Sequence, residues 1–86
     1  MSTAAIRVLL FATLRQQAGR STVELILDEP ASVAGCWERL CEQIPALASM
    51  KDTVRPALNR DYVPWEALAQ PGDELAFIPP VSGGRR

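Results

Sequence analysis

Two adjacent glycines near the end of the sequence, Gly83 and Gly84, are the residues best suited to chemistry in this chain. Glycine has no Cβ, so a Gly-Gly segment can enter a channel too narrow for other residues and leaves the Gly84 carbonyl open to attack. Pro79-Pro80 remove two donors and hold the backbone extended, so they are expected to carry the chain off the sheet edge. A diglycine alone is also what a frayed terminus contains. Behind a strand and a Pro-Pro pair, it indicates a reactive tail.

The rest of the sequence excludes much other chemistry. With no histidine, Ser-His-Asp and Cys-His catalysis and histidine metal sites are not available. Cys36 and Cys41 lie about 140° apart around an expected helix, so they suit neither a disulfide nor a shared metal site. We expect both cysteines to be core or half-buried residues. No bound metal or cofactor is predicted, and the chain is expected to supply no acid or base of its own.

Length and charge point to one small module that works with partners. The 86 residues, 48% of them hydrophobic, suffice for one modest core. Nine basic and ten acidic residues give a net charge of −1 without a basic block, so nucleic acid is not an expected partner. No apolar run approaches the roughly 20 residues of a membrane span, and the N-terminus lacks the features of a secretory signal. We therefore expect a cytoplasmic protein without membrane contact.

The first half of the chain has the periodicity of two strands and a helix. Residues 6–12 and 22–28 alternate with period two and are joined by a turn around 18–20, which predicts a hairpin. The inward faces are Ile6, Val8, Leu10, Val23, Leu25 and Leu27, and Arg7, Leu9 and Phe11 face outward. Ser32 is the expected N-cap of a helix that ends near Gln43 or Ile44, because Pro45 lacks a donor. Residues 45–50 are expected to form a further short turn. The helix buries a stripe of Val33, Trp37, Leu40, Cys41, Ile44 and Leu47.

The second half predicts three more extended segments. Strands are expected at 54–58, 62–63 and 74–78, a helical turn at 65–68, and tight turns at 59–61 and 70–73. This order favours an α+β fold of the β-grasp, or ubiquitin-like, type, in which one main helix packs across a mixed sheet of about five strands. We assign 1–78 to the domain and 79–86 to the tail. Phe11 and Ile78 are then expected side by side on the face opposite the helix, either as a partner surface or as ordinary exposed apolar residues.

Four segments resemble the MoaD/ThiS family of ubiquitin-like sulfur carriers, and within it the small subunits of molybdopterin synthases. Residues 7–15 are similar to that family's opening strand, and 57–63 to its third strand and turn. Residues 72–77 and 78–84, Gly-Asp-Glu-Leu-Ala-Phe and Ile-Pro-Pro-Val-Ser-Gly-Gly, are similar to its final turn, strand and tail.

The resemblance implies a non-catalytic carrier whose terminal glycine is the working group. An E1-like adenylating enzyme would consume ATP to adenylate the Gly84 carboxylate, and sulfur from a persulfide donor would replace AMP to form a thiocarboxylate. The thiocarboxylate would donate sulfur to cyclic pyranopterin monophosphate held by the synthase large subunit. Gly83 and Gly84 would be the reactive end, and the partner-binding residues would be Phe11, Arg15, Tyr62, Ile78, Pro80 and Val81, with Arg15 helping to dock the activating enzyme. A solvated loop charge is the alternative explanation for Arg15.

Arg85 and Arg86 depart from the family pattern, which usually stops at the second glycine. They place the Gly84 carbonyl in an amide, so the encoded chain is expected to be a precursor that a processing protease trims. Their loss would change the net charge from −1 to −3 and is expected to favour a basic partner surface. Alternatively, the two arginines block function. Three other roles remain open: a sulfur carrier for thiamine, cysteine or tRNA thiolation, a ubiquitin-like modifier conjugated through Gly84, and a plain interaction module.

Overall fold

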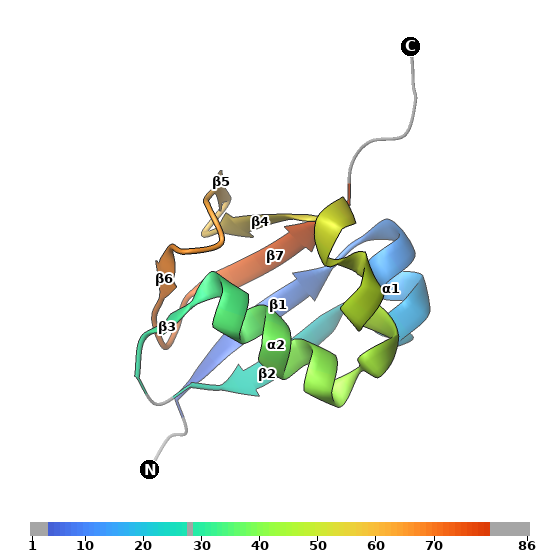
Figure 1. Cartoon of the computed structure of the whole chain (residues 1–86). Helices are drawn as coiled ribbons and strands as arrows, with labels where there is room; N and C mark the ends of the chain where they lie inside the picture. The colour runs from blue at the N-terminus through green and yellow to red at the C-terminus, as the bar shows by residue number, and fades with distance from the viewer. Residues whose placement is uncertain (1–3, 28, 80–86) are drawn as a thin grey trace.

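The chain forms a five-stranded mixed sheet with a helix packed across one face. The computed structural model describes residues 4–27 and 29–79, and Figure 1 shows the strands as one twisted layer behind α2. In order across the sheet, the strands are β2 (Thr22–Ile26), β1 (Ala5–Leu10), β7 (Glu74–Ile78), β4 (Arg55–Leu58) and β5 (Asp61–Tyr62). The central pair β1 and β7 is parallel, and the other neighbours are antiparallel. The α+β class and the β-grasp architecture are confirmed.

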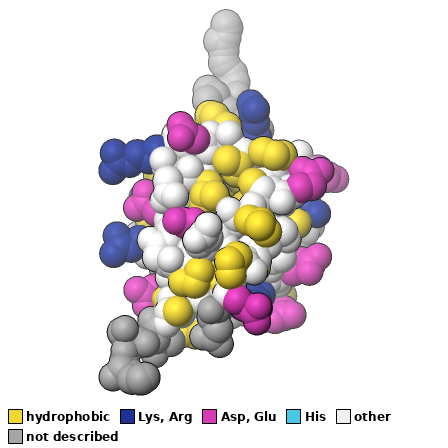
Figure 2. Space-filling model, turned by 90° about the vertical axis from the view of Figure 1, so that its left-hand side faces the viewer, with side chains coloured by type: hydrophobic (Ala, Val, Ile, Leu, Met, Phe, Trp, Pro, Cys, Tyr) yellow, Lys and Arg dark blue, Asp and Glu magenta, His cyan; other side chains and the backbone are white. Residues whose placement is uncertain are grey.

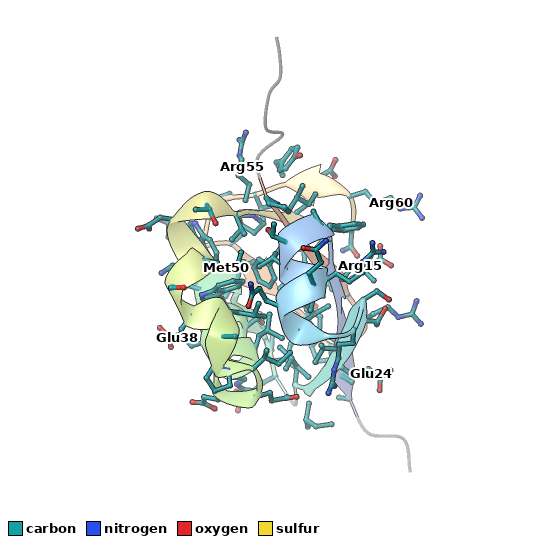
Figure 3. The ribbon with its side chains drawn as sticks, turned by 90° about the vertical axis from the view of Figure 1, so that its right-hand side faces the viewer. Arg15, Glu24, Glu38, Met50, Arg55 and Arg60 are labelled. Atoms are coloured by element: carbon teal, nitrogen blue, oxygen red, sulfur yellow. The ribbon has the colours of Figure 1, made fainter. Side chains whose placement is uncertain are left out.

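The long helix α2 (Val33–Gln43) begins and ends where the sequence predicts. Ser32 is its N-cap, and the Ser32 hydroxyl oxygen accepts a hydrogen bond from the Gly35 N–H at 3.0 Å. Pro45 then starts the 3₁₀ helix η1 (Pro45–Thr53), which replaces the short turn expected at 45–50 with a longer segment. Both elements lie on the same side of the sheet (Figure 3).

The core lies between α2 and the sheet and consists of the inward-facing residues of the alternating strands. All the inward strand residues predicted from the sequence are buried, as are most of the helix stripe. Trp37 and Phe77 meet edge to face with ring centroids 4.8 Å apart, and Trp65 stacks on Phe77 at 5.8 Å. Burial of each large apolar side chain contributes roughly 1.5–3 kcal/mol. The opposite face of the sheet is therefore the one whose side chains are free to meet a partner.

The prediction of a strand over 6–12 is wrong at its end, because β1 stops at Leu10 and α1 (Ala12–Ala18) follows. Ala12 makes the bend with a φ of 51°, a left-handed conformation that alanine rarely adopts. Leu14 anchors the helix by complete burial, and Gly19 ends it in the left-handed conformation with its N–H bonded to the Arg15 carbonyl. The predicted hairpin is thus two antiparallel strands joined through a helix.

The predicted helical turn at 65–68 is also wrong. The chain makes one tight turn from Pro64 to Ala67 and then enters β6 (Leu68–Ala69), which pairs with β3 (Ala31–Ser32) in a separate two-stranded sheet. The carbonyls of Trp65 and Ala67 accept hydrogen bonds from the first two N–H groups of α2, at 3.0 and 2.8 Å. The turn and the strand that follows it are held in place because their carbonyls satisfy donors that a helix start leaves unpaired.

The turn between β4 and β5 is fastened to the start of β7 by Asn59. Asn59 and Arg60 have φ values of 50° and 77°, the conformation of a two-residue hairpin turn. The Asn59 Oδ1 accepts from the Glu74 N–H at 3.0 Å, and its Nδ2 donates to the Asp73 carboxylate at 3.2 Å. One side chain therefore holds a hairpin that forms part of the sheet face opposite α2, which we call the open face.

We expect Asn59→Ala to lower the free energy of unfolding by about 2 kcal/mol, because it removes two side-chain hydrogen bonds and because alanine tolerates the left-handed conformation less well than asparagine does. Asn59→Gly loses the same bonds but tolerates the conformation, so it should cost about 1 kcal/mol. Urea denaturation of both variants measures the difference. Equal losses in the two variants would show that the left-handed conformation carries no cost here.

Candidate functional site

The open face of the sheet carries a row of apolar residues across four strands. Leu9, Ala76, Ala57 and Tyr62 are register partners on β1, β7, β4 and β5. Alternation along each strand turns these residues away from α2. The row crosses the sheet from β1 to the β5 edge, with large residues at its two ends and two alanines at its centre.

This row forms the floor of a hollow of about 390 Å³ on the open face. The hollow is lined by Leu9, Phe11, Ala57, Arg60, Tyr62, Glu74, Ala76 and Ile78. Ala57 and Ala76 are neighbours at its centre, so two methyl groups lie between much larger side chains. Phe11 is 44% exposed and Tyr62 59% exposed. The result is an apolar depression with bulky walls, a shape suited to docking a protein side chain.

Three of the predicted partner-binding residues meet at this hollow. Phe11 is the residue between β1 and α1, Tyr62 belongs to β5 and Ile78 ends β7, and all three line the hollow. The expectation that Phe11 and Ile78 lie together on the open face is therefore confirmed. Arg15 does not line the hollow, although it is one helical turn beyond Phe11, with its N–H 3.4 Å from the Phe11 carbonyl. The predicted residues Pro80, Val81, Gly83 and Gly84 lie outside the described residues.

Sequence reasoning missed the small and charged members of the hollow. Ala57 and Ala76 have no distinctive side chain, and only the strand register shows that they are adjacent. Arg60 and Glu74 form its polar end. Arg55, the register partner of Ile78, places its guanidinium carbon 4.8 Å from the Tyr62 ring centroid. Strand parity offered the one available signal, because it places Arg55, Ala57 and Ala76 on the outward face.

Apolar side chains also gather along the edge formed by β3, β5 and β6. Figure 2 views this side and shows hydrophobic side chains in the middle with charged ones mainly around the margin. Leu68 of β6 is 63% exposed. Ile26, 55% exposed, lies instead on β2 at the opposite side of the sheet, away from the hollow. Ile26 is therefore an exposed apolar residue of the same sheet that can serve as a control.

The described part of the chain offers neither a metal site nor a membrane-spanning helix. Within residues 4–27 and 29–79, no three histidine, cysteine or carboxylate side chains are grouped so as to hold a metal ion. None of the helices in these ranges is both long enough and apolar enough to span a bilayer.

The two cysteines pack as expected, with Cys36 buried and Cys41 half-buried, and both are free thiols. Burial raises the pKa of both thiols. The nearby Arg39 charge opposes that rise at Cys36, whereas the Glu38 charge adds to it at Cys41. Since the thiolate is the nucleophile, both cysteines are expected to be unreactive near neutral pH.

We expect iodoacetamide near neutral pH to alkylate Cys41 more slowly than an unstructured cysteine peptide and to leave Cys36 unmodified. The Cys41 rate should keep rising above the ordinary thiol pKa of about 8.5, because a raised pKa moves thiolate formation to higher pH. Mass spectrometry of peptides gives both rates, and denatured protein is the control in which both cysteines react. Alkylation of folded Cys41 at the peptide rate would contradict the assignment.

The chain is similar to known proteins over most of its length. The ThiS family model matches residues 8–84. The molybdopterin synthase sulfur carrier subunit of Arabidopsis thaliana is 37% identical over 83 residues, covering 96% of this chain and 86% of that protein. The protein of that name from Chlamydomonas reinhardtii is 40% identical over 82 residues, covering 92% and 98%. The crystal structure of small archaeal modifier protein 1 from Haloferax volcanii has a TM-score of 0.83 at 31% identity and covers 91% and 99%.

Proposed function

Because the chain belongs to the ThiS family, we propose that it is a sulfur carrier of molybdenum cofactor biosynthesis and the small subunit of a molybdopterin synthase. The observation that carries this proposal is the identity of 37–40% to the sulfur carrier subunits of Arabidopsis thaliana and Chlamydomonas reinhardtii over more than 90% of the chain. The hollow supports it, because a carrier subunit requires a surface on which a partner can hold it while its tail reacts.

The working group in this proposal is the carboxylate of Gly84. An E1-like adenylating enzyme joins that carboxylate to the AMP moiety of ATP and releases pyrophosphate. The mixed anhydride makes the carbonyl a good electrophile with AMP as its leaving group. The outer sulfur of a donor persulfide then attacks the carbonyl and displaces AMP, which gives an acyl disulfide. A thiol of the partner enzymes cleaves its S–S bond, is oxidised to a disulfide and releases the Gly84 thiocarboxylate, which provides sulfur for the dithiolene of the cofactor. The chain itself contributes the carboxylate and its delivery, while the partner enzymes contribute the catalytic groups.

Removal of Arg85 and Arg86 precedes activation in this scheme. An amide has no carboxylate oxygen with which to attack the α-phosphorus of ATP, so Gly84 must first become the terminal residue. The family match supports this order, because it runs to residue 84 and leaves out the two arginines. A processing protease that cleaves after Gly84 is therefore part of the proposed pathway.

The partner on the open face is the synthase large subunit. Phe11, Tyr62 and Ile78 are the contacts at the end of the sheet from which β7 leads into Pro79. A partner that covers them would hold the domain beside the root of the tail, so that the residues after Pro79 can reach the large-subunit active site. Cyclic pyranopterin monophosphate bound there would receive the sulfur.

A second candidate function is protein modification through Gly84. The observation that favours it is the TM-score of 0.83 and 31% identity to a protein named small archaeal modifier protein 1. The same adenylated glycine would then form an amide with a lysine of a target protein instead of accepting sulfur. The two functions share the fold and the first activation step and differ in the nucleophile.

Reconstitution with the large subunit of the same organism tests the proposal. We expect a protein carrying a Gly84 thiocarboxylate to convert cyclic pyranopterin monophosphate to molybdopterin, and a protein with an ordinary Gly84 carboxylate to give none. If the thiocarboxylate protein also gave none, the synthase role would be wrong. Covalent adducts that join Gly84 to lysines of cellular proteins, and that are lost when Gly84 is deleted, would support the modifier role.

A further inference from the structure

Three arginines border the hollow on the open face: Arg15 and Arg55 lie at the end from which the tail departs, and Arg60 lies at the other end, beside Glu74. Arg60 lines the hollow, and Arg55 stacks on the Tyr62 ring beside Ile78. Arg15 lies one helical turn after Phe11. Figure 3 shows Arg15, Arg55 and Arg60 on different elements in the upper half of the view, with Glu24 in the lower half.

The other end of the open face is acidic. Arg7 pairs in register with Glu24 on β2 and with Glu74 on β7, so its charge lies between two carboxylates. A second hollow at this end, about 270 Å³ in volume, is lined by Ala5, Arg7, Glu24, Gly72, Asp73 and Glu74. Arg60 also lies at this end, because its neighbour Asn59 is hydrogen-bonded to Glu74, so three carboxylates accompany two guanidiniums here. The end near the tail carries Arg15 and Arg55 and is the more basic of the two. The open face is therefore electrically polarised along its strands.

We propose that the partner surface which docks here is apolar at its centre and carries acidic side chains around the part that meets Arg15 and Arg55. This inference rests on the proposed function, since the partner is taken to be the synthase large subunit. An apolar patch bordered by cations is complementary to an apolar patch bordered by carboxylates, and such an arrangement steers the approach and fixes the orientation of two proteins. The orientation directs the tail end of the domain toward the partner site.

The local charge at the tail end of the open face and the net charge of the whole chain predict partner surfaces of opposite sign. Loss of two arginines gives the processed chain a net charge of −3, which by itself favours a basic partner. Steering at short range depends on the charges beside the contact, because the Debye length at physiological salt is only about 8 Å. Arg15 and Arg55 therefore decide the sign of the complementary surface.

The association rate constant with the large subunit, measured by stopped flow from about 0.05 M to about 0.5 M NaCl, tests this proposal. We expect the rate constant of the native sequence to fall by roughly tenfold or more over this range. The double variant Arg15→Gln/Arg55→Gln should associate about fivefold more slowly at low salt, with a flatter salt dependence.

Arg39→Gln is the matched control, because it makes one such charge change on the helix side, where Arg39 bonds to the Ile26 carbonyl. It should associate at the native rate. An association rate constant that rises with salt, or an equal loss of rate for Arg39→Gln, would overturn the proposal of an acidic partner surface.

Nucleic acid is the alternative ligand, since aromatic and arginine side chains suit it as well. A single-stranded oligonucleotide that binds the native sequence but not the double variant, while the association rate with the large subunit is the same for both, would also overturn the proposal. Salt-independent binding in a complex that still makes molybdopterin would refute this inference alone, whereas loss of molybdopterin formation refutes the proposed function.

Discussion

A chain that ends at Gly84 is expected to be adenylated by its activating enzyme, whereas the 86-residue chain is not. The free carboxylate of Gly84 is the nucleophile toward ATP, and in the longer chain that carbon is an amide to Arg85. ATP–pyrophosphate exchange with the cognate enzyme measures this step directly. We expect clear exchange with the shorter chain and none above background with the longer one.

A chain that ends at Gly83 separates the need for a free carboxylate from the need for its position. It has a terminal carboxylate, but its reach is shorter by one residue, about 3.3–3.6 Å when extended. We expect it to be inactive in the same exchange. Exchange with the 86-residue chain, in a preparation whose mass remains unchanged, would contradict the requirement for trimming.

Loss of the apolar walls of the hollow is expected to have the second largest effect. Phe11→Asp or Tyr62→Asp should weaken binding to the large subunit by at least about 30-fold, the equivalent of about 2 kcal/mol. Each change places a carboxylate against an apolar partner surface and removes an aromatic contact. Isothermal titration calorimetry gives the dissociation constants.

Ile26→Asp is the matched control for these two variants. Ile26 is 55% exposed, between Phe11 at 44% and Tyr62 at 59%, and it lies on the same sheet without lining the hollow. We expect it to bind within about twofold of the native sequence, since exposed residues outside an interface contribute little. A loss as large as that of Phe11→Asp would show that the hollow is not the docking surface.

The sheet and the long helix were predictable because their signals are local and consistent. Strict alternation placed Val8, Leu25 and Phe77 in the core, where all three are buried. Ser32 and Pro45 marked the limits of α2, since one supplies a capping oxygen and the other lacks a donor. The central pairing of β1 with β7 was predicted only through the order of elements and the fold it favours.

Two elements were missed because tertiary contacts decide them. The bend before α1 uses Ala12 at a φ of 51°, so no glycine marks it. Gly19 was interpreted as a turn residue, although a glycine after a run of good helix formers is also the usual C-terminal signal of a helix. The segment around Leu68 has the composition of a helical turn, but its neighbours supply carbonyls to the start of α2, and β6 pairs with β3.

The apolar members of the candidate site were predictable, but its shape was not. Parity placed Phe11 and Ile78 on the open face, and resemblance to a family added Tyr62. The depth of the hollow depends on the adjacency of Ala57 and Ala76, and its basic border depends on Arg55 and Arg60 beside Tyr62. These relations involve strand register between residues about 20 positions apart or turn geometry, which composition and periodicity do not encode.

The intact mass of the untagged protein, isolated from cells that are making molybdenum cofactor, tests the central claim most directly. We expect the mass of a chain that has lost Arg85 and Arg86 and has exchanged one terminal oxygen for sulfur. This result would identify Gly84 as the sulfur-bearing end. Recovery of only the full 86-residue chain from such cells would contradict the account, because the diglycine would then never be exposed for activation.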